Sequence, residues 1–237
     1  GERLKKCDLL ISPVGSTEAH GPHGCYGEDT FLVTRMAEAV AQRTGCTVSQ
    51  PIWFGTHPYH HIGMPGTIPV DEDTFTAYLS SVIAGFWNAG FRKQILLNGH
   101  GQEYVIPTAI HRFARRFQVP SLIINLNWYY AIPQYVKDKA HGGPFETPFI
   151  HADECETSYS LALFPEYTKP AVAVDTEFHG FLPPGRYPGT RTQAAGPSRS
   201  RGTPRASSAR PRSQAPRRRS PASRPCSTTS RISSTTS

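Results

Sequence analysis

Residues 8–29 read D-L-L-I-S-P-V-G-S-T-E-A-H-G-P-H-G-C-Y-G-E-D, and this stretch decides the class of fold. Its first part, residues 8–14, is apolar and has the length of a buried β-strand. A polar, glycine-rich loop follows, and residues 30–44 then carry apolar side chains at helical spacing up to Gly45. A strand that leads through a loop into a helix predicts an α/β unit.

The same alternation continues toward the C-terminus. We expect further strands at residues 47–54, 93–97 and 121–126 and helices at residues 104–117 and 154–163. A further helix, capped by Asp73 or Thr74, should run to about Asn88. Alternating strands and helices predict a layered α/β/α domain with a largely parallel sheet. In such sheets the loops at the carboxyl ends of the strands gather the ligand site.

Charge divides the chain into two parts. The chain has 25 basic and 18 acidic residues, and 12 of the basic residues are arginines between Arg186 and the C-terminus, where no acidic residue occurs. Residues 1–185 therefore carry 13 basic and 18 acidic residues. We expect them to form one domain that is incomplete at both ends, followed by a disordered Arg/Ser/Pro-rich tail at 186–237. We expect this tail to be frameshifted or dispensable rather than an arm that binds nucleic acid.

Cysteine usage and hydropathy indicate in which cellular compartment the protein is expected. The five cysteines form no C-x-x-C pair and are odd in number, so neither a disulfide framework nor a structural zinc site is expected. A reducing cytoplasm is the simplest prediction. No apolar run approaches the roughly 20 residues that cross a bilayer, and we expect no membrane partner.

The loop after the first strand carries a possible metal site. Glu18 and His20 are two residues apart, so both side chains point to the same side of an extended segment. Asp29 returns at the start of the following helix, where it can bridge two cations or simply cap the helix. Carboxylate and imidazole ligands together suit Zn, Mn or Fe better than calcium.

Three further stretches carry candidate ligands. They are Asn98-Gly99-His100-Gly101 after a strand, His151-Ala-Asp-Glu-Cys-Glu156 at a helix start, and the loop from His57 to Thr67 with its three histidines. Each has a structural alternative: a tight turn, a first turn whose acidic residues complement the helix dipole, and a Pro/Gly turn with incidental histidines. The stretches at His57 and Asn98, like the loop at Gly15, follow predicted strands, so we expect them at the edge where the strands' carboxyl ends gather the ligand site.

Together these segments resemble the creatininase (creatinine amidohydrolase) family. The matching stretches are P-V-G-S-T-E-A-H-G-P-H, G-T-H-P-Y-H-H-I-G-M-P-G-T-I, N-G-H-G and H-A-D-E-C-E-T-S, in the family's order. The resemblance implies a creatininase-like α/β fold, two divalent metal ions (Zn, Mn or Fe) and a homo-oligomer, often a hexamer. It implies metal ligands at Glu18, His20, Asp29 and His100, with Asp29 bridging, an active-site histidine at His151 and an acidic site residue at Glu156.

The chain departs from the family at one ligand. Creatininase has a glutamate ligand two residues after the N-G-H histidine, where this chain has Gln102, and Glu103 follows one residue later. The last ligand of the second ion can therefore be Glu156, Glu103 or a water, and Glu103 is also a candidate catalytic residue. His61, Trp128 and Tyr129 are candidates for substrate contact, although packing explains each of them equally well.

The resemblance also implies a reaction. The stretches G-H-G-Q-E-Y and F-E-T-P-F-I-H-A-D-E resemble a branch of the family described as 3-dehydro-scyllo-inosose hydrolases, which act in inositol breakdown. We expect metal-activated water to open a small cyclic substrate, either a cyclic keto-inositol by C–C cleavage or a cyclic amide of the creatinine type. The alternative is a catalytically inactive, truncated relative that only binds metal.

Overall fold

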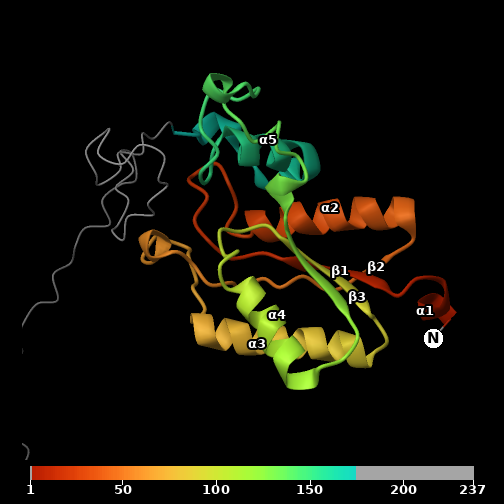
Figure 1. The fold of residues 1–237 in the computed structure, drawn as a ribbon. Helices are drawn as coiled ribbons and strands as arrows, with labels where there is room; N and C mark the ends of the chain where they lie inside the picture. Colours follow the sequence, from red (N-terminus) through yellow and green to blue (C-terminus); the bar gives the residue numbers. More distant parts are fainter. Residues whose placement is uncertain (1, 175–237) are drawn as a thin grey trace, which may run out of the picture. The chain divides into compact units, whose positions relative to one another are not determined.

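The structure, a computed structural model, describes residues 2–174. The predicted tail and the predicted domain boundary at residue 185 lie outside the described residues. A four-stranded parallel sheet forms the centre of the described part (Figure 1). Its strands run in the order β2-β1-β3-β4 and comprise β1 (Leu9–Val14), β2 (Thr47–Val48), β3 (Lys93–Asn98) and β4 (Leu122–Asn127).

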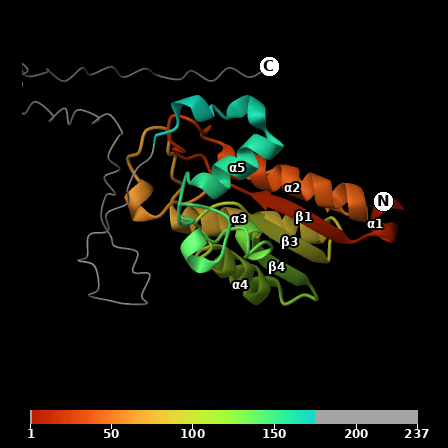
Figure 2. The same ribbon diagram turned by 90° about the horizontal axis from the view of Figure 1, so that it is seen from above.

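Helices cover both faces of this sheet, as Figures 1 and 2 show. The α-helices are α1 (Glu2–Lys6), α2 (Glu28–Thr44), α3 (Glu72–Asn88), α4 (Ile106–Phe117) and α5 (Glu154–Leu163), and short 3-10 turns span Tyr59–His61, Trp128–Tyr130, Lys139–His141, Pro165–Tyr167 and Pro170–Val172. The predicted α/β fold with a parallel sheet is confirmed. No helix within residues 2–174 is long and apolar enough to cross a membrane.

Two apolar cores lie on opposite faces of the sheet, because side chains alternate along each strand. On one face Val14 and Leu96 pack with α3 and α4 through residues such as Phe113. On the other face Ile11 and Leu97 pack with α2 and α5. The polar side chains at the ends of the strands are thereby held between two packed layers.

The strand register brings the carboxyl ends of three strands together. Val14, the last residue of β1, pairs with Asn98 of β3, which pairs with Asn127 of β4. Asn98 Nδ2 donates a hydrogen bond of 2.9 Å to Asn127 Oδ1. The loops that follow these strands therefore begin at one level, at the edge where a ligand site is expected.

Most boundaries agree with the prediction to within two residues, and the difference is largest at β2 and at the cap of α3. The strand expected at residues 47–54 shortens to Thr47–Val48, because Pro51 lacks the N–H that a continuing ladder needs, although Ile52 still forms a bridge to Val14. Asp71 caps α3, its side chain accepting 3.0 Å from the backbone N–H of Thr74. The predicted cap at Asp73 or Thr74 is therefore wrong by two or three residues.

Candidate metal centre

Glu18 and His20 lie on the loop after β1 and are both buried, at 2% and 0% exposure. Their alternation turns both side chains toward one interior cluster. His20 Nε2 lies 3.3 Å from Asp29 Oδ1 and 3.9 Å from Glu156 Oε2. Glu18 Oε1 lies 2.9 Å from His100 Nδ1. Residues from four separate stretches of the chain thus converge.

Asp29 lies between two histidines. Its Oδ1 faces His20 and its Oδ2 lies 3.1 Å from His100 Nδ1. The hydroxyl of Ser16 donates 2.7 Å to Oδ2 and so fixes the carboxylate. The N-cap residue of α2 is Gly27, with no side-chain cap bond, so the capping alternative for Asp29 does not hold. An aspartate with one oxygen toward each of two imidazoles has the arrangement of a bridging ligand.

His100 reaches the cluster because glycine precedes it. A Cβ at Gly99 would lie 2.5 Å from the carbonyl oxygen of Asp29, so only glycine permits β3 and α2 to approach this closely. His100 Nε2 donates 3.0 Å to the carbonyl of Thr56, which can only accept. This bond leaves Nδ1 directed at Glu18 and Asp29. His100 is therefore held in place for ligation rather than being incidental to a turn.

Gln102 does not take part in the cluster. Its side chain is fully buried, and its Nε2 donates 3.0 Å to the carbonyl of Gly15 and 3.2 Å to Asn98 Oδ1. Its Oε1 accepts 3.2 Å from the backbone N–H of Thr56. Gln102 thus ties three loops together.

The start of α5 supplies the last groups. Asp153 caps the helix by accepting from the backbone N–H groups of Cys155 and Glu156, as the alternative of a structural first turn expects. Ala152 has a left-handed φ of 49°, and its N–H donates 2.6 Å to Glu156 Oε2. A non-glycine residue in this region is strained, and such strain clusters at functional sites. The hydrogen bond from Ala152 holds the Glu156 carboxylate beside His20.

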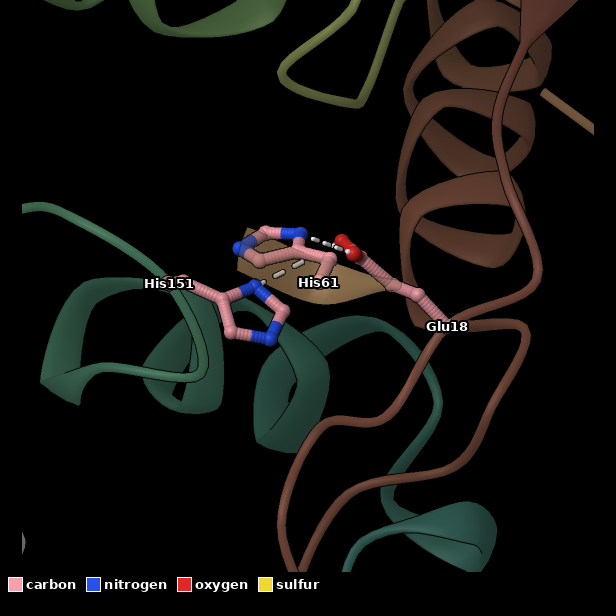
Figure 3. Close-up of side chains that lie close together, drawn as sticks. All are labelled: Glu18, His61 and His151. Carbon is pink, nitrogen blue, oxygen red and sulfur yellow. Dashed lines mark hydrogen bonds and ion pairs between the residues drawn. The ribbon is translucent and has the colours of Figure 1, made fainter. Parts of the chain in front are cut away.

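His61 and His151 lie on the same side of Glu18 (Figure 3). His61 Nδ1 lies 2.7 Å from Glu18 Oε2, and His151 Nδ1 lies 3.4 Å from Glu18 Oε1. His151 Nε2 donates 2.6 Å to the carbonyl of Ala19, so the lone pair of the neutral ring is on Nδ1 and faces the cluster. The two imidazole rings are 4.5 Å apart between centroids.

The donors form four overlapping groups within the described residues. In each group the ligand atoms lie within 4.8 Å of one another: Glu18, His20 and Asp29; His20, His151 and Glu156; Glu18, His57 and His100; and Glu18, His61 and His151. Buried carboxylates and imidazoles in one cluster are the donor set of Zn and Mn sites. Buried charges are normally paired or bound to metal. The residues present therefore fit divalent ions.

Without metal, the cluster holds His100 protonated and Glu18 ionised at neutral pH. Burial would lower the pKa of His100, but the charge of Glu18 and hydrogen bonds with Asp29 and Glu18 raise it to about 10. Burial also opposes ionisation of Glu18, yet the charges of His100 and His151 hold its pKa well below the usual value. A bound cation would take the place of the proton on His100.

Glu156 and His151, by contrast, are shifted toward their neutral forms. Burial, with the charge of Asp153, raises the pKa of Glu156 well above its usual value. Burial lowers the pKa of His151 to about 4, so its ring is neutral at neutral pH. A neutral, half-buried imidazole with its lone pair on the cluster side can accept a proton there.

Three sequence candidates lie apart from the four groups. Glu103 takes part in none of them within the described residues. Trp128 is fully buried and contacts Tyr129, Phe149 and Tyr159 edge-on. Packing accounts for the position of Trp128, and half-buried Tyr129 belongs to the same apolar core.

Two buried groups near the site were not assigned from the sequence. Glu28, which its place beside Asp29 on the polar loop suggests to be exposed, is buried and accepts 2.6 Å from the hydroxyl of Ser160. His57, which had no role among the three loop histidines, lies in the cluster. Its position directly after Gly55 and Thr56, in the loop that follows the strand predicted at residues 47–54, was the signal available.

The chain is similar in sequence to known proteins. A family model described as Creatininase: Creatinine amidohydrolase matches residues 1–213. The 3-dehydro-scyllo-inosose hydrolase of Thermotoga maritima is 72% identical over 184 residues, which are 78% of this chain and 59% of that protein. The chain thus spans less than two thirds of that relative's length. The creatinine amidohydrolase of Pseudomonas putida is 28% identical over 218 residues, which cover 82% of each chain.

Solved structures give the same result. A structure described as "Creatininase Mn" superposes with a TM-score of 0.68 at 28% identity and covers 84% of this chain and 83% of that chain. A mutant creatininase described as "Zn-Zn type" superposes with a TM-score of 0.67 at 28% identity over the same shares. The similar structures thus include proteins that hold divalent metal.

Proposed function

The chain belongs to the creatininase family, and on that premise we propose that it is a metal-dependent hydrolase that opens a small cyclic substrate. We propose 3-dehydro-scyllo-inosose as that substrate. The observation that carries the proposal is Asp29, whose two oxygens lie 3.3 Å from His20 and 3.1 Å from His100. Because the chain spans 59% of the inosose hydrolase, the activity is a proposal for the protein that contains this chain.

Two ligand sets share Asp29. Glu18, Asp29 and His100 would hold one ion, and His20, Asp29 and Glu156 would hold the other. We assign Glu156 as the ligand in place of Gln102, because the side chain of Gln102 already hydrogen-bonds to the backbone of Gly15 and Thr56 and to the side chain of Asn98. Zn and Mn are the ions that this mixed donor set favours.

The bond changes define what the residues must do. Hydrolysis adds the hydroxyl of water to a ring carbonyl carbon and breaks the bond from that carbon to its neighbour. The electron pair left on the neighbouring carbon then takes up a proton. When bound, two divalent ions would acidify the attacking water and polarise the carbonyl.

His151 is the proposed proton carrier. Its Nε2–H is fixed on the carbonyl of Ala19, and its Nδ1 faces the cluster beside Glu18. Because the pKa of His151 is lowered to about 4, Nδ1 is free of a proton at neutral pH and can accept one from water. The resulting imidazolium, with a pKa of about 4, is acidic enough to give this proton to the carbon that keeps the electron pair.

His61 is proposed to line the substrate side of the cluster. It is buried, with 7% exposure, and its ring lies against that of His151. Its place between Glu18 and His151 would orient a substrate oxygen. Assembly as a homo-oligomer, a hexamer by the resemblance, is a prediction that rests on the family alone, and a cytoplasmic location is a prediction that rests on the cysteine usage.

The substrate is chosen by similarity, because 72% identity to the inosose hydrolase far exceeds 28% to the creatinine amidohydrolase. The test is to load the protein with Mn²⁺ or Zn²⁺ and offer 3-dehydro-scyllo-inosose and creatinine separately. We expect a keto-acid from the former, loss of turnover with a chelator, and recovery when metal returns. Ions bound without turnover of either compound would favour an inactive relative that only binds metal.

A further inference from the structure

His57 lies inside the cluster, although neither proposed ligand set uses it. The residue is 2% exposed, and its Nε2 lies 3.9 Å from Glu18 Oε2. Neither of its ring nitrogens makes a hydrogen bond with any residue between 2 and 174. Buried polar atoms in proteins are nearly always bonded, so an imidazole in this position calls for a partner that the polypeptide does not supply.

The partner is indicated by the neighbours of His57. One ligand atom each from Glu18, His57 and His100 lie within 4.8 Å of one another. The rings of His57 and His100 are 4.6 Å apart between centroids and tilted by 52°, so they converge rather than stack. Since His100 Nδ1 faces Glu18 and Asp29, a cation between these groups would also lie within reach of His57.

The backbone before His57 is fixed toward the cluster. Thr56 donates its N–H to Gln102 Oε1 and accepts from His100 Nε2 through its carbonyl. A Cβ at Gly55 would clash with Gln102, so this approach requires glycine. His57 is thus held by the same loop that orients His100.

We propose that His57 is a further metal ligand, which binds the ion held by Glu18, Asp29 and His100. This proposal rests on the proposed two-ion function and specifies one of its two sites as richer in histidine. The chemistry is that of a neutral imidazole donating a lone pair to Zn²⁺, Mn²⁺ or Co²⁺.

The test uses Co²⁺ alone as the probe, with metal-free full-length protein. Wild type should bind two ions, and His57→Leu should weaken one of them by at least about 100-fold, more than loss of an outer partner costs. His23→Leu is the matched control, because His23 is also buried with an unpaired Nδ1 but belongs to none of the four groups. It should retain both affinities.

A second variant tests the position without depending on affinity. His57→Cys offers a thiolate at the same place, so Co²⁺ should produce a sulfur-to-cobalt charge-transfer band absent from wild type and from His23→Cys. Thermal melting without metal checks the fold: His57→Leu should melt no lower than wild type, since it replaces an unpaired imidazole by an apolar side chain.

The outcomes separate the two proposals. If wild type binds two ions but His57→Leu binds both with unchanged affinity and His57→Cys gives no such band, His57 is not a ligand and the proposed function stands. If wild type binds no Co²⁺, the proposed function itself is overturned, and the role of His57 with it.

Discussion

The two halves of the cluster are unlike. Around Glu18 the neighbours are imidazoles, from His57, His61, His100 and His151, and the carboxylate is held ionised. Around His20 lie the carboxylates of Asp29 and Glu156 and one imidazole, that of His151, and the pKa values of His20 and Glu156 are both raised well above their usual values. The second half therefore holds more protons that an ion must displace, and we expect its ion to be the weaker and the more sensitive to pH.

The largest effect should come from the residue common to both halves. Asp29→Asn removes the shared anionic ligand, so we expect both ions to be lost. Activity should then fall by more than about 10⁴-fold, because loss of a single acid or base already costs about 10²–10⁴-fold. Metal analysis after dialysis measures the ions. Asp8→Asn, which changes a surface aspartate bonded to Lys93, is the control. Retention of one tightly bound ion would show that Asp29 is not shared.

The next effect separates chemistry from ion binding. His151→Ala should lower turnover by about 10²–10⁴-fold while both ions stay bound, because a proton carrier is lost and no ligand. His111→Ala, on the exposed face of α4, should leave turnover unchanged. If His151→Ala releases an ion, His151 is a ligand rather than only a proton carrier, since it lies within one of the four groups in each half.

A smaller effect should be confined to one half. Glu156→Gln removes a carboxylate ligand from the ion beside His20, and we expect that ion to bind at least about 100-fold more weakly, more than loss of an outer partner costs, with the other ion unchanged. Calorimetric titration with Mn²⁺ resolves the two. Equal weakening of both ions would contradict the division into halves.

The smallest effect is on stability and its pH dependence. The pKa of His100 is raised from 6.5 to about 10 in the folded chain, so in metal-free protein its stabilisation is complete below pH 6.5 and is lost as the pH rises toward 10. A bound ion replaces that proton and removes the loss. The gain in melting temperature on adding Zn²⁺ should therefore grow between pH 6.5 and 10, and a gain that shrinks over this range would contradict the assignment.

Local pattern sufficed for part of the site. The alternation of Glu18 and His20, and the glycines that flank His100, are short-range features, and the structure turns these side chains to one cluster as the pattern predicts. The strands and helices also follow local periodicity. The α/β class and the convergence of Glu18, His20 and His100 on one cluster could therefore be predicted from local sequence patterns.

Long-range contacts account for what the sequence could not predict. Glu28 is buried because Ser160, 132 residues away, packs against it. His57 enters the cluster because Gln102, 46 residues from Thr56, fixes the preceding backbone. Trp128 could be a substrate contact or a core residue by sequence, and its aromatic neighbours become known only when the chain is folded.

The most direct test of the paired-ion centre is a crystal structure of the protein loaded with Zn²⁺, with anomalous scattering measured at the zinc edge. We predict two peaks about 3.5–4 Å apart, both touching Asp29, one beside Glu18 and His100 and the other beside His20 and Glu156. A single peak, or peaks that Asp29 does not touch, would contradict the account.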